Sequence, residues 1–579
     1  MADPFHPERI HAALGPEFYD PVLPAAFPET RLRFRNDRWA ARMGLGTLDE
    51  AGWIRHFGRF EPLPGSLPEP LALRYHGHQF RTYNPDLGDG RGFLFAQARD
   101  LGDGRLLDFG TKGSGQTPWS RTADGRLTLK GGVREILATE MLEALGVYTS
   151  KTFSLIETGE ALYRGDEPSP TRSSVLVRLS HSHIRIGSFQ RLAALGETAA
   201  LRRLVDHSIA HYWPDAAADP DPVAGLYDRV TGAVAQMGAE WFAAGFVHGV
   251  VNSDNVGITG ESFDYGPWRF LDRFDPGFTA AYFDQTGLYA FARQAEALNW
   301  NLARLGECLI PLSSRTAIQA AFDTFADRFL AALTARTFAR LGLDPGPEAP
   351  ARALMQGFWA AMQRTSPPFQ QVFHDLLGAD PGRLRASPIR AIFETADWAE
   401  VIDDLRALSP APRLAAARTH PLTARERPET MVIAEVEAIW SAIDRDDDWS
   451  PLAAKIAAVR EAVAALHDPR DALVRPEGAL RGRALRPSVR APATASKRPP
   501  PAVFCSTVTG VPVRSPSAAI RRQATGRVKR PRSRGYASAS ARADVPPRRD
   551  ESCQYDRRCI STRPARSSAS APSRLGSPS

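Results

Sequence analysis

Residues 246–267, FVHGVVNSDNVGITGESFDYGP, place small polar residues between apolar segments and so restrict what this chain can fold into. The stretch carries Asn252, Asp254 and Asn255 early and Asp264 near its end. Acidic and amide side chains are therefore held in short loops between segments that can be buried. Loops of this kind present hard oxygen ligands to a divalent cation that also holds a nucleotide phosphate.

The spacing can be compared with the protein kinase catalytic loop, H-R-D-x-x-x-x-N, followed by D-F-G. His248 takes the His position, Asn255 the metal-binding Asn position, and the D-Y-G that begins at Asp264 the D-F-G position. The catalytic Asp of the kinase pattern falls on Val250, which cannot accept a proton, whereas Asp254 stands beside the metal-binding Asn. A surface loop rich in turn formers is the alternative for N-S-D-N alone. D-Y-G at this spacing favours a kinase-like site with altered chemistry.

A lysine and a glutamate upstream fit the same interpretation. Lys112 ends an apolar, strand-like run, the position expected for a phosphate-binding lysine. Residues 131–146 have apolar side chains at helical spacing, and Glu135 lies in the first turn, where the helix dipole favours a carboxylate. A strand Lys facing a helix Glu is the kinase arrangement that orients the lysine. Each residue alone is more often a solvated charge; together with Asn255 and Asp264 they predict a nucleotide site.

The sequence D-L-G-D-G-R occurs twice, at 86–91 and at 100–105, beside apolar runs. Gly-Asp-Gly between such runs indicates a hairpin, so we interpret the two copies as two turns of one sheet. The first copy contains Gly88, Gly90 and Arg91 and could also cover a phosphate, because glycines let backbone N–H groups approach an anion. Gly-rich turns are common, and this signal is weak by itself.

Arg178 lies inside the apolar, strand-like run 174–179, and Arg185 follows shortly after it. A strand Arg usually lies at an edge facing water, whereas two Arg aimed at one cleft would form a fork for phosphate oxygens. His207-x-x-x-His211 lacks the Glu of a metalloprotease helix, so zinc is disfavoured there.

The pattern along the chain predicts an α+β protein with a protein-kinase-like, two-lobed fold. We expect an extended N-terminal arm over 1–60 and a strand-rich, nucleotide-binding N-lobe over 61–195. A helical C-lobe with the catalytic and metal loops follows over 196–475, and residues 267–285 are expected to form a loop packed over the site. The predicted strands cover 92–96, 106–112, 152–156 and 174–179, and the predicted helices after the first cover 201–212, 222–245, 316–341 and 351–364.

The last part of the chain, 476–579, differs in composition. It holds 22 Lys and Arg against 5 Asp and Glu, so the 72 basic and 65 acidic residues of the full sequence leave 50 and 60 for residues 1–475. The pI of about 9.3 therefore comes from this segment and not from the part expected to fold. Its Arg, Pro and Ser content predicts a disordered tail. The same composition resembles the translation of a GC-rich gene in the wrong reading frame. We do not expect the rest of the chain to bind nucleic acid, and any such binding would come from this basic tail.

Other classes of protein are disfavoured by simple counts. Only Cys308 of four cysteines lies outside the tail, so no disulfide framework or cysteine-based metal site is expected. The N-terminus MADPFHPERI shows no signal peptide, and no apolar run is long enough to span a bilayer. We predict a soluble, cytoplasmic protein with no membrane partner.

Six separated blocks of the sequence together resemble one protein family. The blocks are YHGHQF, LGDGRG, KGSGQTPWSRTADGR, VREILATEMLEALG, SHIRIG and HGVVNSDNVGITGESFDYGP. They are similar to the selenoprotein O (YdiU) family, pseudokinases that act as protein adenylyltransferases. The resemblance runs from about residue 70 to 300 and more weakly to about 470. Trp119 and residues 130–132 depart from the usual family pattern.

The resemblance implies transfer of AMP from ATP to Ser, Thr or Tyr hydroxyls of proteins, with ATP flipped relative to kinases. It implies Asp254 as proton acceptor, Asn255 and Asp264 as ligands of Mg²⁺ (or Mn²⁺), and Glu135 as the partner of the lysine. The implied nucleotide contacts are Gly88, Gly90, Arg91, Lys112, Asp124, Gly125, Arg178, Arg185 and Asp264. Asp124 and Gly125 rest on the resemblance alone.

Three alternatives stay open. The same site could transfer UMP from UTP with Mn²⁺, or a phosphoryl group from ATP as a kinase does. The chain could also be a non-catalytic nucleotide-binding scaffold, although a scaffold has no need of the metal site predicted at Asn255 and Asp264.

Overall fold

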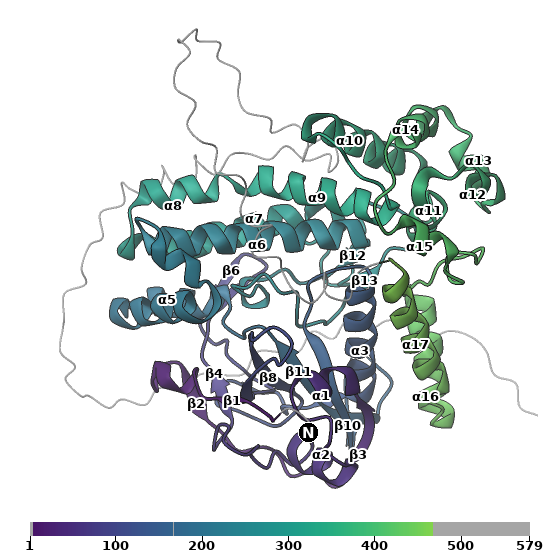
Figure 1. Cartoon of the computed structure of the whole chain (residues 1–579). Helices are drawn as coiled ribbons and strands as arrows, with labels where there is room; N and C mark the ends of the chain where they lie inside the picture. The colour runs from purple at the N-terminus through teal and green to yellow at the C-terminus, as the bar shows by residue number, and fades with distance from the viewer. Residues whose placement is uncertain (1–3, 166, 467–579) are drawn as a thin grey trace, which may run out of the picture. The chain divides into compact units, whose positions relative to one another are not determined.

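The computed structural model describes residues 4–165 and 167–466 (Figure 1). Strands dominate up to residue 180 and helices dominate after residue 186. The predicted α+β class, strand-rich first and helical later, is thereby confirmed. The predictions for the tail, 476–579, lie outside the described residues.

A nine-stranded antiparallel sheet forms the N-terminal part. Its strands run in the order β2-β4-β7-β8-β11-β10-β3, with β1 paired to β7 and β9 paired to β11. All seven residues of β8 are buried, so this strand lies in the interior. The strands are β1 (Pro7–Glu8), β2 (Tyr19–Pro21), β3 (Arg31–Arg35), β4 (Leu71–Leu73), β7 (Leu94–Arg99), β8 (Leu106–Lys112), β9 (Leu127–Thr128), β10 (Lys151–Leu162) and β11 (Thr171–Ser180).

Only one of the two D-L-G-D-G-R copies is a turn of this sheet. Residues 100–105 connect β7 to β8, which pair as an antiparallel hairpin. Residues 86–91 instead follow β6 (Thr82–Asn84), which pairs with β5 (Gly77–Gln79) in a separate two-stranded sheet. The expectation of two turns in one sheet is wrong for the first copy, which connects β6 to β7 and is held beside β4 by hydrogen bonds between Asp89 and Leu73.

Residues 1–60, for which the sequence predicts an extended arm, contribute β1, β2 and β3 to the sheet. They also form α1 (Asp37–Arg42) and α2 (Glu50–Phe57). Trp53 and Phe57 of α2 are fully buried, and the Phe57 ring stacks on Phe109 of β8 with centroids 6.1 Å apart. This segment therefore covers one face of the sheet with a core of its own.

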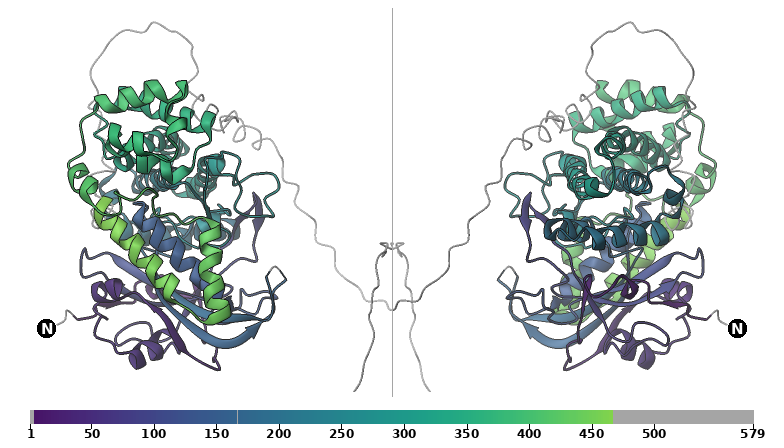
Figure 2. Two further views of the ribbon diagram at one scale, coloured as in Figure 1. Left: turned by 90° about the vertical axis from the view of Figure 1, so that its right-hand side faces the viewer. Right: turned by 90° about the vertical axis from the view of Figure 1, so that its left-hand side faces the viewer.

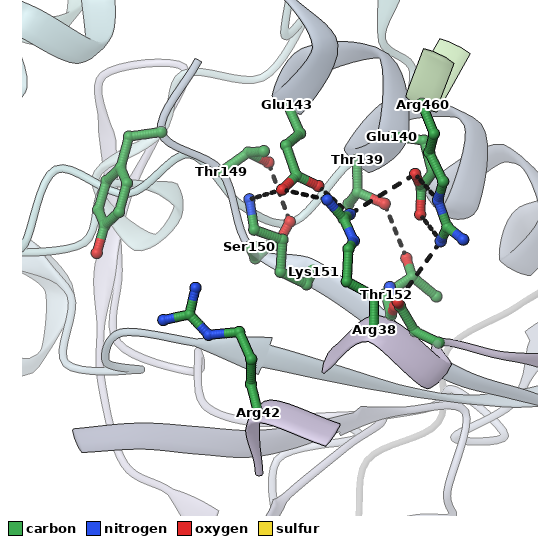
Figure 3. Close-up of polar contacts among 12 residues, drawn as sticks. Arg38, Arg42, Thr139, Glu140, Glu143, Thr149, Ser150, Lys151, Thr152 and Arg460 are labelled. Atoms are coloured by element: carbon green, nitrogen blue, oxygen red, sulfur yellow. Dashed lines mark hydrogen bonds and ion pairs between the residues drawn. The ribbon is translucent and has the colours of Figure 1, made fainter. Parts of the chain in front are cut away.

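Helix α3 (Leu129–Ala144) begins where Thr128 accepts a hydrogen bond from the backbone N–H of Gly131, 3.1 Å away. One side of α3 packs on β10 and β11. Its other side is covered by α16 (Ile433–Asp446) and α17 (Ser450–Leu466), so the end of the described chain returns to the N-terminal part (Figure 2). Figure 3 shows the contact between them, where Arg460 of α17 lies 2.6 Å from Glu140 of α3.

The helical part is built around α6 (Pro222–Ala244), which is buried along most of its length and packs against α7, α8 and α9. Asp221 caps its start and Gly245, in the left-handed conformation, ends it. The short strands β12 (Phe246–Val247) and β13 (Arg269–Phe270) follow and pair with each other. The remaining helices are α4 (Ile186–Leu195), α5 (Thr198–Tyr212), α7 (Gln294–Leu309), α8 (Arg315–Phe322), α9 (Phe325–Leu341), α10 (Glu348–Thr365), α11 (Phe369–Asp375), α12 (Pro381–Ala386), α13 (Arg390–Phe393), α14 (Ala396–Ala407) and α15 (Leu414–Thr419).

Among the described residues, no helix is both long and apolar enough to cross a membrane.

Candidate functional site

Four charged side chains from four separate parts of the chain meet beside the sheet. Lys112 ends β8, and its Nζ lies 2.6 Å from Glu135 Oε2 of α3 and 3.0 Å from Asp264 Oδ1. Arg178 of β11, the strand paired with β8, places Nη1 3.2 Å from Asp264 Oδ1 and 3.4 Å from Glu135 Oε1. Each cation therefore contacts both carboxylates. The strand Lys and helix Glu that the sequence sets 23 residues apart are in direct contact.

The cluster is buried on the side of the sheet and open on the side of Asp264. The side chains of Lys112 and Glu135 are 6% and 1% exposed, whereas that of Asp264 is 28% exposed. Burial alone would raise the pKa of Asp264, but Lys112, Arg178 and Arg91 together hold it well below its usual value. Asp264 is therefore an ionised carboxylate at neutral pH, facing the opening.

The D-Y-G turn is fixed by contacts on both sides of Asp264. Asp264 itself has φ +63°, a left-handed conformation that Asp tolerates better than most residues. The carbonyl oxygen of Phe263 lies 3.0 Å from His248 Nε2. The buried Tyr265 hydroxyl donates to Ser262 Oγ at 2.8 Å and also contacts the Thr149 hydroxyl. The carboxylate is thus presented by a backbone that has little freedom to move.

Asp254 and Asn255 lie together in the short 3₁₀ helix η3 (Ser253–Asn255). The Asn255 side-chain amide donates to the carbonyl oxygen of Val250 at 2.9 Å, which leaves the amide oxygen available as a ligand. Asp254 Oδ1 is buried and has no hydrogen-bond partner. Gly77 lies so close that a Cβ there would stand 3.1 Å from this oxygen. Burial raises the pKa of Asp254 to about 6, which suits a group that accepts a proton near neutral pH.

Arg185 links the first D-L-G-D-G-R turn to the loop that carries Asp254. Its Nη2 lies 3.5 Å from Asp89 Oδ1, and its Nη1 donates to the carbonyl oxygen of Asp254 at 3.4 Å. The guanidinium carbons of Arg178 and Arg185 both lie 5.3 Å from the centre of the Phe263 ring. The two arginines therefore flank one ring instead of facing bulk water at a sheet edge.

Gly88 and Gly90 are required by the packing of Trp119. A Cβ on Gly88 would lie 2.3 Å from Trp119 Cγ, and one on Gly90 would lie 2.8 Å from the Trp119 carbonyl oxygen. The indole nitrogen of Trp119 donates to Asp20 at 2.9 Å, which holds the ring in place. Arg91 of the same turn is exposed. The turn is thus held close to the site by an aromatic residue that the family resemblance marks as unusual.

Asp124 and Gly125 lie apart from the Lys112–Asp264 cluster. Asp124 Oδ2 pairs with Arg164 Nη1 at 2.8 Å, and Oδ1 accepts from the backbone N–H of Arg126 at 2.9 Å. Gly125 has φ +70°, and a Cβ there would stand 2.3 Å from the Gly115 carbonyl carbon. This loop therefore packs on the segment that follows Lys112, without contacting the charged cluster.

Sequence reasoning missed several residues that position the site. Asp89 pairs with Arg185, and Tyr75 stacks on the Arg185 guanidinium at 4.1 Å. His183 accepts from Arg178 Nε at 3.4 Å and contacts Asp108 Oδ2 through Nδ1 at 3.2 Å. Two sequence signals could have indicated these residues. His183 lies in the block SHIRIG, and Asp89 lies in the Gly-Asp-Gly turn.

The donor set at the opening fits a small hard cation. In the described part of the chain, no group of three or more His, Cys, Asp or Glu side chains could hold a metal ion. Asp264 and Asn255 nevertheless offer an ionised carboxylate and a free amide oxygen, donors that Mg²⁺ and Mn²⁺ accept. Mg²⁺ is usually held by one or two protein ligands together with water and substrate phosphates.

Comparison with known proteins gives a consistent result. The sequence profile of the family described as "Protein adenylyltransferase SelO" matches residues 4–460. A protein of Gloeobacter violaceus named "Protein nucleotidyltransferase YdiU" is 47% identical over 461 residues, covering 77% of this chain and 92% of that protein. Proteins of the same name from Synechococcus elongatus and Rhodopseudomonas palustris are 46% and 38% identical over 468 and 406 residues. These two alignments cover 77% and 68% of this chain and 93% and 81% of the relatives.

Proposed function

This chain belongs to the protein adenylyltransferase SelO family and is a protein nucleotidyltransferase, and we propose that it transfers AMP from ATP to protein hydroxyls. The acceptors would be Ser, Thr or Tyr side chains, and pyrophosphate would be released. The observation that carries this proposal is the meeting of Lys112 and Arg178 at Asp264, 3.0 and 3.2 Å from the same carboxylate oxygen. Two cations beside an ionised, partly exposed carboxylate are suited to hold nucleotide phosphates together with a cation.

Lys112, Arg178 and Arg185 would bind the phosphates of ATP. Glu135 and the Asp108–His183 pair hold two of these cations in place, so little reorganisation is needed when the nucleotide arrives. The turn with Gly88, Gly90 and Arg91 would approach the nucleotide through its backbone. Asp124 and Gly125 would also contact the nucleotide, a role that is proposed from the family resemblance alone.

Asn255 and Asp264 would hold Mg²⁺ or Mn²⁺. A cation bound there supplies positive charge that offsets the negative charge of the triphosphate. The low pKa of Asp264 favours this role, because the carboxylate is ionised before any cation binds.

Asp254 would accept the proton of the acceptor hydroxyl. The hydroxyl oxygen then forms a bond to the α-phosphorus of ATP. The bond from that phosphorus to the oxygen bridging to the β-phosphate breaks, and pyrophosphate leaves with the electron pair. Supporting this role, Asp254 is buried with one oxygen unpartnered, so its charged form gains from an incoming O–H donor.

The same contacts favour a protein-kinase-like, two-lobed arrangement of the chain. Lys112 and Glu135 come from the strand-rich part, and the D-Y-G carboxylate comes from the helical part. A non-catalytic scaffold would have no use for a carboxylate kept ionised at the mouth of this cluster.

The test uses the full-length protein with α-³²P-ATP, γ-³²P-ATP or α-³²P-UTP, with Mg²⁺ or Mn²⁺, and a denatured protein as acceptor. We expect label from the α-phosphate of ATP only, lost in Asp264→Asn and Asp254→Asn. Asp272→Asn, an exposed residue of the following loop, is the matched control and should keep activity.

Other outcomes would contradict the proposal in different ways. Label from γ-³²P-ATP would indicate a kinase, and preferred incorporation from UTP with Mn²⁺ would indicate UMP transfer. Intact ATP binding without any label would indicate a scaffold.

A further inference from the structure

Two neighbouring aromatic side chains are exposed close to the proposed proton acceptor. Tyr282 is 80% exposed and Phe283 is 47% exposed, and their ring centroids lie 5.1 Å apart. Single apolar side chains on a surface are ordinary, but adjacent ones in a contiguous patch mark interaction sites. Together with Phe80, whose ring centroid lies 5.8 Å from that of Phe283, they form what we call the aromatic patch.

The loop that carries Tyr282 and Phe283 is anchored from below. The next residue, Asp284, is buried and accepts hydrogen bonds from the backbone N–H groups of Leu288 and Tyr289, at 2.9 and 2.8 Å. The loop also packs on the catalytic segment, because a Cβ on Gly249 would lie 3.0 Å from that of Ala280. The exposure of the aromatic pair is therefore a property of a fixed loop.

The aromatic patch is joined to Asp254 through Asn252, two residues earlier in the chain. The backbone N–H of Phe80 donates to Asn252 Oδ1 at 3.2 Å, and the Tyr289 hydroxyl donates to the same oxygen at 2.7 Å. The Phe80 ring in turn lies 5.0 Å from that of Tyr289. The patch therefore borders the loop that carries Asp254.

Two residues at the tip of the β5–β6 hairpin have an unfavourable backbone conformation. Phe80 and Arg81 have φ +49° and +63°, a left-handed conformation that disfavours residues with side chains. Arg81 is held by Glu296, 2.7 Å from its Nη2, and lies over the ring of Trp300 at 5.7 Å. Glu296 also lies 3.3 Å from Arg293 Nε, so two arginines share one carboxylate beside the patch, and the patch itself consists of aromatic rings.

We propose that the aromatic patch binds a large apolar side chain of the acceptor protein, close in sequence to the hydroxyl that is modified. This inference rests on the proposed function, because it assigns the acceptor end of the same site. Aromatic side chains give large contact area at low conformational cost, which is why they dominate interfaces of this kind. The patch would select acceptors by apolar contact, whereas Asp254 selects only the hydroxyl.

The test compares peptides that contain one central Ser, Thr or Tyr in an Ala, Gly and Lys background. In each peptide, Phe replaces one flanking Ala at a different position. For the wild-type chain, we expect one or two Phe positions to lower KM by about 30-fold, the effect of a single interface hot spot. The double variant Tyr282→Ser/Phe283→Ser should lose this preference without a change in KM for ATP.

Tyr163→Ser is the matched control, because Tyr163 is 74% exposed on the β10–β11 connection and should leave the preference intact. Binding of the same peptides, labelled with fluorescein, is followed by anisotropy so that the patch is tested without turnover. The proposed role of the patch would be wrong if the preference for Phe survived the double substitution, or if the wild-type chain showed no such preference. Either result would overturn it even if AMP is transferred. Normal, patch-dependent peptide binding without transfer of label would overturn the proposed reaction alone.

Discussion

At the scale of single residues, Asp264 combines a charge requirement with a backbone requirement. Its carboxylate contacts Lys112 and Arg178, and its φ of +63° lies in the left-handed region. Asn tolerates this backbone conformation nearly as well as Asp, whereas Ala does not. Substitution by Asn or by Ala therefore separates the two requirements.

We expect Asp264→Asn and Asp264→Ala to lower AMP transfer by a similar factor, about 100-fold or more, because both remove the ionised ligand. The Ala variant should be less stable than the Asn variant by about 1 kcal/mol, the cost of a left-handed residue with a Cβ and no compensating polar side chain. Urea unfolding and α-³²P-ATP labelling of both variants measure the two effects. Equal stability of the two variants would contradict the backbone argument.

The core of the site could be predicted from sequence because its residues have characteristic partners. Lys112, Glu135 and Asp264 are each ambiguous alone, but their order and spacing fit one known arrangement, and the structure places them in contact. Asp89 and His183 were missed, because they act through Arg185 and Arg178 and no spacing rule connects them to the cluster, although each lies in a block of the family resemblance. The roles of Asp124 and Gly125 stay predictions.

At the scale of elements, helix α9 supplies arginines to the ends of two other helices. Arg336 donates to the carbonyl oxygens of Leu145 and Gly146, just beyond the end of α3, at 3.0 and 2.8 Å. Arg340 donates to the carbonyl oxygen of Ala243 in the last turn of α6, and to Gln370 Oε1 at 2.6 Å. Cations at helix C-termini satisfy free carbonyl groups and complement the helix dipole.

Arg340→Met should lower the free energy of unfolding by about 1–3 kcal/mol, because it leaves partly buried acceptors without donors. Met keeps the apolar contact with Phe373, on whose ring the guanidinium lies at 3.7 Å. Arg406→Met removes an exposed pair with Asp403 and is the control, with an expected loss of about 0–1 kcal/mol. Similar losses in the two variants, measured by urea unfolding, would count against the capping role.

Histidines buried between the N-terminal segment and α5 make stability depend on pH. Burial lowers the pKa of His11 to about 4, and neither ring nitrogen has a hydrogen-bond partner. In the unfolded chain this pKa is about 6.5. Between these values the unfolded state binds more protons, so the free energy of unfolding falls as pH drops from about 6.5 towards 4.

We expect His11→Phe to remove about 2 kcal/mol of the stability loss seen between about pH 7 and pH 5, because Phe keeps the ring and does not titrate. The exposed His6→Phe is the control and should leave the pH profile as it is. Urea unfolding at a series of pH values gives the comparison. A His11→Phe profile parallel to that of the wild-type chain would show that His11 is not the source.

Helices and strands could be predicted from sequence where the apolar periodicity is strong. The predictions were wrong where a strand pairs with a strand far away in the sequence. The predicted helix 222–245 matches α6 (Pro222–Ala244), but the predicted helix 316–341 is two helices, α8 and α9, divided around Asp323 and Thr324. Apolar spacing continues across that break, so periodicity alone could not reveal it. The strands within residues 1–60 pair with β4, β7 and β10, and no local pattern specifies such pairing.

At the scale of the whole molecule, the helices at the end of the described chain close over α3. Arg460 lies 2.6 Å from Glu140, whose side chain is 4% exposed. On the same face, Arg38 pairs with Glu143 at 2.6 Å, and Lys151 Nζ lies 3.7 Å from Glu143 (Figure 3). Helix α3 also carries Glu135, which contacts Lys112 and Arg178 of the sheet, so these contacts hold the helix that presents a site residue.

Arg460→Met should destabilise the chain by about 1–3 kcal/mol, because the buried Glu140 loses its bidentate partner. Adding Glu140→Gln should recover part of this loss, since no buried charge is then left unpaired. A double-mutant cycle by urea unfolding measures the coupling. Additive effects of the two substitutions would mean that the pair does not hold α17 to α3.

Deletion of residues 467–579 should leave AMP transfer within about 2-fold of the full chain, because the family match ends at residue 460. Labelling from α-³²P-ATP and nucleic-acid binding over a range of salt are measured in both forms. Transfer lost on deletion would show that the last part of the chain contributes to the enzyme.

The contact between Arg460 and Glu140 spans 320 residues of sequence. During synthesis, α3 leaves the ribosome long before the helix that covers its outer face exists. A growing or prematurely terminated chain therefore keeps the Glu140 side of α3 uncovered. We therefore expect chains that end before α17 to be less stable around α3, the helix that carries Glu135.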